Sequence, residues 1–479
     1  MSAVRRLRGV AAGATLAVCA ACSGSDGTAP PPPPWIATVF NIDWPSRSTL
    51  GVAEQQGELR ALLDRAAALR MNAVVLQVRS TGDALYPSTL EPWSRVLTGA
   101  AGRDPGWDPL AFAVTEAHAR GLQLHAWINP FRAASDTTLA TLAPLHFARR
   151  RPELAPVVGT QRWFDPGEEA VQDHVLAVAR DIVSRYAVDG LHLDDFFYPY
   201  PSASWPNTAL FPDSAAWTRY LATAGASPLS RADWRRRNID RFIERLYTEL
   251  HVARPTLVIG ISPFGIWRPG NPSGVTGLDY FTECFADSRR WLQQGWVDYL
   301  APQLYWSLAS TGQPFGALLD WWRSQSVARR HVWPGLAAYR VSDNSANPYA
   351  PAEIPAQVAA VRARSGWSDP ATSSGGVLLY NATAVRLNRG GLADSLGGGA
   401  WRDAAWMPAM PWLDAAAPAA PATLAIEANG TRLRWSAASD ADVRWYAVQW
   451  RSGIERCGRS TLWGMHRRRP ARRGEQCDN

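Results

Sequence analysis

The chain of 479 residues is 47% hydrophobic and carries a formal net charge of +7 at pH 7, a length that suits an α/β barrel with an appendage. Residues 1–22 contribute +3 and residues 451–479 contribute +5, which leaves −1 for the part between them, so the folded part has no electrostatic support for nucleic-acid binding. Only three of the five cysteines lie beyond residue 22, which excludes a disulfide-stapled scaffold.

Residues 1–22 are predicted to be a lipoprotein signal peptide. A basic start with three arginines precedes an apolar run at 10–21, which is short for a membrane-spanning helix. The small-small-Cys sequence that ends this run resembles the bacterial lipoprotein signal, so we expect Cys22 to carry the lipid. Cys19 is the alternative lipidation site, and an ordinary secretory signal is the alternative for the whole segment. Residues 23–34 end in five prolines and are expected to form a stiff tether.

Residues 35–390 alternate between strand and helix patterns. Eight apolar runs are predicted as strands, and they are 36–43, 73–79, 122–132, 191–195, 257–268, 297–306, 332–340 and 376–382. Amphipathic stretches between them predict helices, and the clearest are 59–70, 109–120, 168–186 and 239–250. Eight strands that alternate with helices predict a (β/α)₈ TIM barrel, with a doubly wound sheet as the alternative fold.

Polar and aromatic side chains occupy the ends of these predicted strands. Because the loops after the strands carry the active site of a (β/α)₈ barrel, we expect a polar cleft in which aromatic rings stack on sugar faces. The residues expected to bind substrate there are Asn41, Asp43, Gln77, Arg79, His125, Trp127, Asn129, Arg132, His192, Tyr198, Trp267, Arg268, Glu283, Gln303, Tyr305, Trp306 and Tyr339. No cluster has the spacing of a metal site and no glycine-rich phosphate loop occurs, so we expect no metal or other cofactor.

The segment DGLHLDDFFYPYP, residues 189–201, places two adjacent acids where an apolar strand ends. We predict that Asp194 and Asp195 are catalytic, because glycosidic cleavage needs an acid for the leaving oxygen and a carboxylate or substrate amide to stabilise the cationic centre. Asp194 ranks first, since side chains alternate along a strand and Asp195 would then point the other way. Asp43, Glu283 and Glu353 are candidate partner acids. Retaining and inverting chemistry both stay open, because they differ in carboxylate separation.

Five runs of the sequence together resemble the glycosyl-hydrolase-like 10 family over about residues 35–390. They are NAVVLQVRSTGDALYPSTLEPWSRVLTG, DPLAFAVTEAHARGLQLHAWINPFR, DGLHLDDFFYPYP, ISPFGIWRP and DYLAPQLYW. The resemblance implies a secreted or lipid-anchored bacterial TIM-barrel glycosidase that acts on peptidoglycan strands stripped of their stem peptides. Ser23 and Gly24 lack the Asp associated with inner-membrane retention, which favours the periplasmic face of the outer membrane. The sequence leaves the oligomeric state open.

The fourth predicted strand is also similar to the Asp-Gly-x-Asp-x-Asp-x-Glu signature of family 18 chitinases. On that pattern His192 replaces the first inner Asp, Asp194 matches the second, and Phe196 stands where the catalytic Glu belongs. The departure keeps two alternatives open, which are a non-catalytic carbohydrate-binding barrel and a hydrolase of another extracellular polysaccharide.

The C-terminal part is predicted to contain three further segments. Residues 391–416 are expected to be a linker, and residues 417–451 resemble the first half of a fibronectin type III module. Within that half, TLAIEANGTRLRW gives two strands around an Asn-Gly turn, and WYAVQWR alternates as a third strand. Residues 452–479 are basic, lack a strand pattern and are expected to be disordered.

Overall fold

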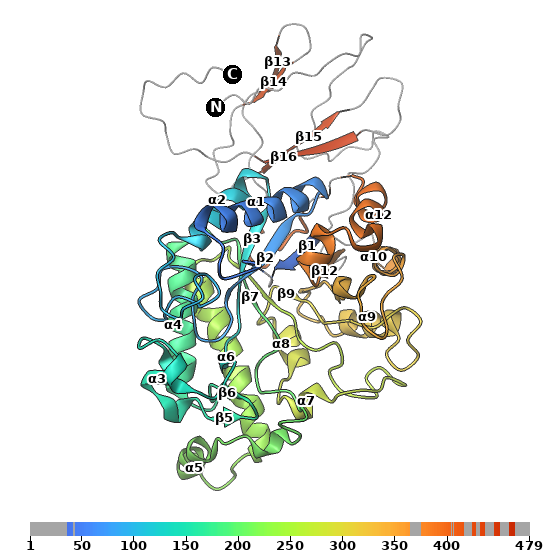
Figure 1. Ribbon diagram of the computed structural model, residues 1–479. Helices are drawn as coiled ribbons and strands as arrows, with labels where there is room; N and C mark the ends of the chain where they lie inside the picture. The colour runs from blue at the N-terminus through green and yellow to red at the C-terminus, as the bar shows by residue number, and fades with distance from the viewer. Residues whose placement is uncertain are drawn as a thin grey trace.

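The computed structural model describes residues 36–41, 44–364, 375–403, 405 and 407–415, and the backbone of strands at 424–427, 432–435, 445–450 and 459–464. Its central feature is one parallel sheet (Figure 1). The strands of this sheet are β1 Ile36–Asn41, β2 Ala73–Arg79, β3 Gln123–Ile128, β7 Gly190–Leu193, β8 Val258–Ile261, β9 Tyr299–Leu300, β10 His331–Val332, β11 Gly335–Leu336 and β12 Gly376–Leu379. The predicted strand positions are therefore all occupied by parallel strands, and the fold is mixed α/β.

The order of the strands follows the chain. From one edge to the other it is β10-β9-β8-β7-β3-β2-β1-β12-β11, without the reversal of order that marks a doubly wound sheet. The predicted closed ring of eight strands is not reached, because the hydrogen-bonded ladder ends at β10 and β11. These two strands replace the predicted strand 332–340. Pro334 separates them, and proline has no N–H to donate to a ladder.

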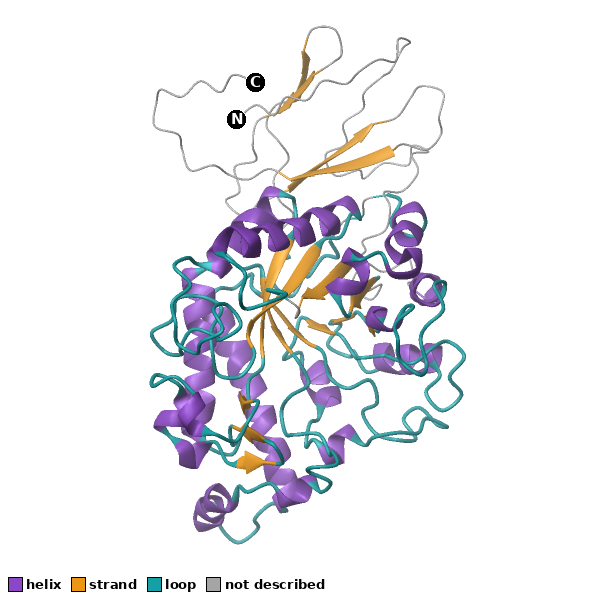
Figure 2. Ribbon diagram, viewed as in Figure 1, coloured by secondary structure: helices purple, strands orange, loops and turns teal. Residues whose placement is uncertain are grey.

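Helices surround the central strands (Figure 2). The longer ones are α1 Val52–Ala68, α2 Pro109–Ala119, α4 Glu169–Arg185, α5 Ser214–Thr223, α6 Arg231–Ala253, α9 Phe315–Ser324 and α10 Glu353–Arg364. The shorter ones are α3 Phe147–Arg150, α7 Tyr280–Glu283, α8 Ser288–Gln294, α11 Ala382–Arg386 and α12 Leu392–Gly398. A separate antiparallel sheet has the strands β4 Arg132–Ala134, β5 Val157–Val158 and β6 Gln161–Trp163. None of the described helices combines the length and hydropathy needed to cross a membrane.

Local sequence explains where the main helices begin. Asp108 accepts a hydrogen bond from the N–H of Ala111, and Pro109 occupies the first turn of α2, where a missing N–H costs nothing. Ser230 caps α6 in the same way by accepting from the N–H of Asp233. The apolar stripe predicted at 239–250 is the buried face of α6, as its helical spacing requires.

The core has two parts, one between the sheet and the helices and a smaller one that includes Trp127, Tyr299 and Trp333. The rings of Tyr299 and Trp333 stack with centroids 4.7 Å apart. Gly260 on β8 makes room for this stack, because a Cβ atom there would lie 1.9 Å from Cζ of Tyr299. The smaller core therefore depends on a strand position without a side chain.

The segment predicted as a linker, residues 391–416, packs onto the sheet and its helices instead. Trp401 and the apolar residues of α12 are buried in the main core. Residues 407–415, here called the C-terminal strap, place Met407, Met410 and Leu413 against the smaller core. Nε1 of Trp412 donates to Oδ1 of buried Asp298, just before β9, at 2.8 Å. The strap therefore covers the amino ends of the strands, because Asp298 immediately precedes a strand.

The residues after the strap contain two antiparallel hairpins. Strand β13 (Leu424–Glu427) pairs with β14 (Arg432–Trp435), as the Asn-Gly turn predicts. Strand β15 (Trp445–Trp450) pairs with β16 (Arg459–Gly464). Strand β16 lies within the segment 452–479 that we expect to be disordered, and β15 supplies its hydrogen-bonding partner. The expectation of disorder stays a prediction. The fibronectin type III resemblance stays a prediction.

Candidate active site

Asp194 and Asp195 lie immediately after β7, at the carboxyl edge of the sheet. Both are largely buried, with exposed fractions of 9% and 6%. The alternation predicted for them does not apply, because β7 ends at Leu193, and the two carboxyl groups are close enough to shift the pKa of each other. The pair is thus one unit, and the ranking of Asp194 over Asp195 by strand geometry has no structural basis.

Three donors from neighbouring segments hold Oδ1 of Asp194. The backbone N–H of Asp195 lies at 2.9 Å, Oγ of Ser262 at 3.3 Å and Nε2 of Gln303 at 3.1 Å. Nε2 of Gln303 also donates to the carbonyl of Ser262 at 3.0 Å, which fixes the orientation of its amide. With Oδ1 accepting these bonds, Oδ2 of Asp194 is the oxygen that can carry a proton.

The groups around Asp194 and Asp195 affect the pKa of the two carboxyl groups differently. Burial, followed by the charge of Asp195 and a hydrogen bond to it, raises the pKa of Asp194 well above its ordinary value. Burial also raises the pKa of Asp195, but hydrogen bonds donated by the Tyr200 hydroxyl at 2.5 Å and by Asp194 oppose that rise. The charge of Asp195 adds to the rise in the pKa of Asp194, whereas the hydrogen bonds to Asp195 oppose the rise in its own pKa, which favours an acid at Asp194 beside a carboxylate at Asp195.

The two predicted histidines lie beneath this pair rather than beside a substrate. His192 Nε2 contacts Oγ of Ser262 at 2.9 Å, and its Nδ1 contacts the Tyr299 hydroxyl at 2.8 Å. His125 Nδ1 contacts the same hydroxyl at 3.1 Å. Burial lowers the pKa of His192 well below its usual value and that of His125 to about 4. These neutral, buried rings position Ser262 and, through it, Asp194.

Aromatic rings flank the acid pair on its open side. Tyr200 stacks on Tyr280 with centroids 5.9 Å apart, and the Tyr280 hydroxyl donates to the backbone carbonyl of Asp195 at 2.9 Å. Phe264 packs edge-on against Trp306, and Tyr305 stacks on Tyr380. Tyr305 also packs edge-on against Tyr339. Except for Tyr280, these rings are partly exposed, so they could stack on a sugar.

Tyr280 is a residue of the site to which the sequence assigned no role, whereas Ser262 and Tyr380 stand at predicted strand ends. Tyr200 belongs to the aromatic run after the two acids, and Tyr280 lies in the DYFTE segment beside Glu283. The positions of these two tyrosines next to predicted site residues were the sequence evidence that could have indicated a role for them. The bond from each tyrosine to Asp195 is visible only when the loops are folded.

Several predicted substrate-binding residues are placed away from the acid pair or in the core. Arg79 is fully buried and forms an ion pair with Glu91, with Nη2 and Oε1 2.7 Å apart. Tyr198 is fully buried between the rings of Phe211 and Phe285. Neither side chain can touch a sugar in this conformation, which corrects both predictions. Trp127 and Asn129 are also buried and hydrogen-bonded to each other at 2.9 Å.

The remaining predicted residues either have partners outside the acid pair or are not fully described by the structure. Nε1 of Trp267 donates to Asp287, and Arg268 pairs with Asp279 at 3.2 Å. Glu283 accepts from Oγ1 of Thr208 at 3.2 Å, while Glu353 accepts from the N–H of Leu308 at 2.7 Å, so both acids have other partners. Gln77 is partly buried at the end of β2. Asp43 lies outside the described residues, and only the backbone of Asn41 is described.

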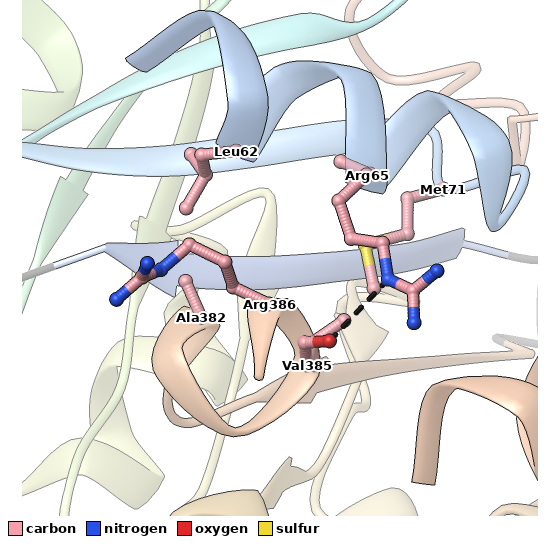
Figure 3. Close-up of a pocket in the computed structure, with 7 residues that line it drawn as sticks. Leu62, Arg65, Met71, Ala382, Val385 and Arg386 are labelled. Atoms are coloured by element: carbon pink, nitrogen blue, oxygen red, sulfur yellow. Dashed lines mark hydrogen bonds between the residues drawn. The ribbon is translucent and has the colours of Figure 1, made fainter. Parts of the chain in front are cut away.

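A small hollow lies far from these acids in the outer layer. It has an empty volume of about 190 Å³ that includes open solvent, and α1 and α11 line it (Figure 3). Nε of Arg65 donates to the carbonyl of Val385 across it at 3.4 Å. The lining holds no carboxylate, so it offers no acid for glycoside chemistry. Among the described residues, no group of three or more His, Cys, Asp or Glu could hold a metal ion.

The raised pKa of Asp194 predicts how stability depends on pH. The unfolded chain loses the Asp194 proton near pH 4, whereas the folded protein keeps it to higher pH. Folding therefore loses stability as the pH rises from about 4 toward the folded pKa, by up to about 1.4 kcal/mol per pH unit. Asparagine does not titrate, so Asp194→Asn should become progressively more stable than wild type over this range. Urea unfolding at a series of pH values measures the difference, and a difference independent of pH would contradict the prediction.

The chain is similar in sequence to one family model and to several known proteins. The model of the family described as glycosyl hydrolase-like 10 matches residues 34–350. Glycosyl hydrolase YngK of Bacillus subtilis (strain 168) is 37% identical over 396 residues, which cover 81% of this chain and 75% of that protein. Glycosyl hydrolase DigH of Escherichia coli (strain K12) is 34% identical over 332 residues, 65% of this chain and 74% of that protein.

Two solved structures show weaker similarity. The glycoside hydrolase domain of PgaB (BpsB) from Bordetella bronchiseptica aligns with a TM-score of 0.47 and 15% identity, over 79% of this chain and 100% of that one. The endo-1,4-beta-mannanase of Rhizomucor miehei aligns with a TM-score of 0.46 and 9% identity, over 78% of this chain and 97% of that one.

Proposed function

The chain belongs to the glycosyl hydrolase-like 10 family and is a glycosidase, and we propose that it cleaves N-acetylated bacterial glycan, namely peptidoglycan strands without stem peptides. The observation that carries the proposal is the buried acid pair of Asp194 and Asp195 beside partly exposed aromatic rings. An acid and a carboxylate meet the needs of glycosidic cleavage, and the rings suit the apolar faces of sugars.

The closeness of the two acids favours an N-acetylated substrate. Retaining glycosidases separate their two carboxyl groups by about 5 Å, and inverting ones by more. Asp194 and Asp195 are neighbours in the chain whose carboxyl groups shift the pKa of each other, so we expect them to act on one face of the sugar. A nucleophile for the anomeric carbon must then come from elsewhere. The carbonyl oxygen of the sugar's own acetamido group can supply it.

In the proposed mechanism, Asp194 gives its proton to the glycosidic oxygen while the bond from that oxygen to the anomeric carbon breaks. The acetamido oxygen forms the new bond to the anomeric carbon, and the Asp195 carboxylate accepts the acetamido N–H and balances the developing positive charge. Tyr200 and Tyr280 hold Asp195 in place through its side chain and its backbone carbonyl. Water then opens the cyclic intermediate and returns a proton to Asp194.

We also propose that the sheet completes a (β/α)₈ barrel. The N–H of Gly335 donates to the carbonyl of Pro302 at 2.9 Å, and the N–H of Leu378 donates to the carbonyl of Pro334 at 3.1 Å. These bonds link the segment after β9 to β11, and the turn before β11 to β12. They support a closed arrangement in which the segment 331–336 takes the seventh strand position.

A purified protein starting at residue 23, incubated with peptide-free glycan strands, tests the proposal. We expect mass spectrometry to detect shorter N-acetylated oligosaccharides. Binding without any shortening would instead favour the carbohydrate-binding barrel, which Phe196 at the place of the chitinase glutamate supports. Cleavage of a different polysaccharide, without cleavage of peptide-free glycan strands, would favour a hydrolase of another extracellular polysaccharide.

We propose that the protein is anchored by a lipid on Cys22 to the periplasmic face of the outer membrane. Cys22→Ala should move the protein from the membrane fraction to the soluble fraction of the cell envelope, because firm anchoring needs two or more acyl chains. Fractionation followed by mass spectrometry of the N-terminal peptide measures this. Cys19→Ala is the matched control and should leave the protein in the membrane fraction. An acylated Cys22→Ala protein would contradict the assignment.

A further inference from the structure

Arg132 is held as a cation beside the acid pair. It begins β4 and lies opposite Trp163 on β6. Its guanidinium carbon lies 4.7 Å from the centroid of the Phe196 ring, and Phe196 packs 6.2 Å from the Trp163 ring. Phe196 directly follows Asp195 in the chain. The ring therefore places a cation at the edge of the active site.

The guanidinium of Arg132 lacks an acidic partner among the described residues. It donates one long hydrogen bond, from Nη2 to Oε1 of Gln161 at 3.5 Å, and its Nε is buried without an acceptor. Burial lowers its pKa, while the charges of Asp194 and Asp195 oppose this most strongly, although neither acid forms an ion pair with it. An arginine stays charged in any such setting, so a cation with one long hydrogen bond and an unpaired Nε lies near the two acids.

A carboxylate is the group that fits these donors. Its two oxygens match the planar fork of a guanidinium and can accept two parallel bonds. A chain of N-acetylglucosamine alone has no such group. A muramyl residue carries a lactyl ether whose carboxyl is bound as an amide when a stem peptide is present and is a free carboxylate when the peptide has been removed.

We propose that Arg132 is a specificity-determining residue that binds the free lactyl carboxylate of muramyl residues. The inference rests on the proposed function and deepens it. It gives a physical reason for a preference for peptide-free strands, because an amide-linked peptide removes the charge that Arg132 would bind and adds bulk at the same position.

Binding of two matched glycans tests this role. One is the peptide-free strand with free carboxylates, and the other is the same strand with those groups converted to primary amides. We expect a protein carrying Asp194→Asn, which prevents turnover, to bind the carboxylate form about 10- to 100-fold more tightly. Adding Arg132→Met should abolish that preference, and Arg132→Lys should retain part of it, because lysine keeps the charge but not the fork.

Arg60→Met is the matched control, because Arg60 stacks on Phe112 at the same 4.7 Å but on the outer helix α1. It should leave the preference unchanged. Equal binding of both glycans by the parent protein, or a preference that survives Arg132→Met, would overturn the inference while leaving cleavage of either glycan intact. If wild-type protein neither binds nor cleaves either glycan, the proposed function itself fails.

Discussion

Replacing Asp194 with asparagine should lower the rate of glycan cleavage by about 10²–10³ while leaving the protein folded and able to bind glycan. Asparagine keeps the shape of the side chain and an oxygen that can accept from Ser262 and Gln303. It can neither release a proton to the glycosidic oxygen nor carry a charge. The initial rate of oligosaccharide release from peptide-free strands measures the effect.

Two further variants make this test specific. Asp195→Asn should cost a comparable factor, because each of the two acids shifts the pKa of the other. Asp240→Asn is the control, since Asp240 is a partly buried acid on α6 whose pKa is raised by desolvation to about 6, yet its partner is Trp291 rather than the site. It should cleave within a few-fold of wild type. Wild-type turnover by Asp194→Asn would refute the assigned role.

Gly260→Ala should destabilise the protein by at least about 3 kcal/mol, the upper part of the range for overpacking a core. The added Cβ would lie 1.9 Å from Cζ of Tyr299. The Tyr299 ring cannot move aside freely, because its hydroxyl contacts His192 and His125 and its face stacks on Trp333. Urea unfolding, followed by tryptophan fluorescence, measures the loss.

Gly57→Ala is the control, because we expect it to stabilise the protein rather than destabilise it. Gly57 lies in α1, and a Cβ atom there would meet nothing within 4 Å. Alanine should stabilise the helix by roughly 0.5–1 kcal/mol, because glycine loses more freedom on folding. If Gly260→Ala unfolds at the same urea concentration as wild type, the ring must be able to shift, and the packing described for the smaller core would be wrong.

The strands and the acid pair could be predicted from the sequence because both depend on local patterns. Apolar runs alternate with amphipathic helices over residues 36–382, and two acids follow the buried run that forms β7. The direction of the second acid could not be predicted in this way. Alternation holds only within a strand, and β7 ends one residue before Asp194.

Burial of charged residues was the hardest feature to predict. Arg79 occupies a strand end, which suggested a place in the cleft, but Glu91 twelve positions later neutralises it in the core. The C-terminal strap was missed for a related reason. Its apolar residues Met407, Met410 and Leu413 have no helical or strand period, and their partners lie on strands far away in the chain.

The neighbours of β1 impose an order on folding. This first strand pairs on one side with β2 and on the other with β12, where Ile36 lies opposite Gly376, 340 positions later. Until synthesis or export has delivered residue 376, one edge of β1 has no partner, and an unpaired strand edge is a template for aggregation. Pairing across so long a separation is also slow. A chain exported from its amino end would therefore need its first strand protected until the 340 residues up to Gly376 had followed Ile36.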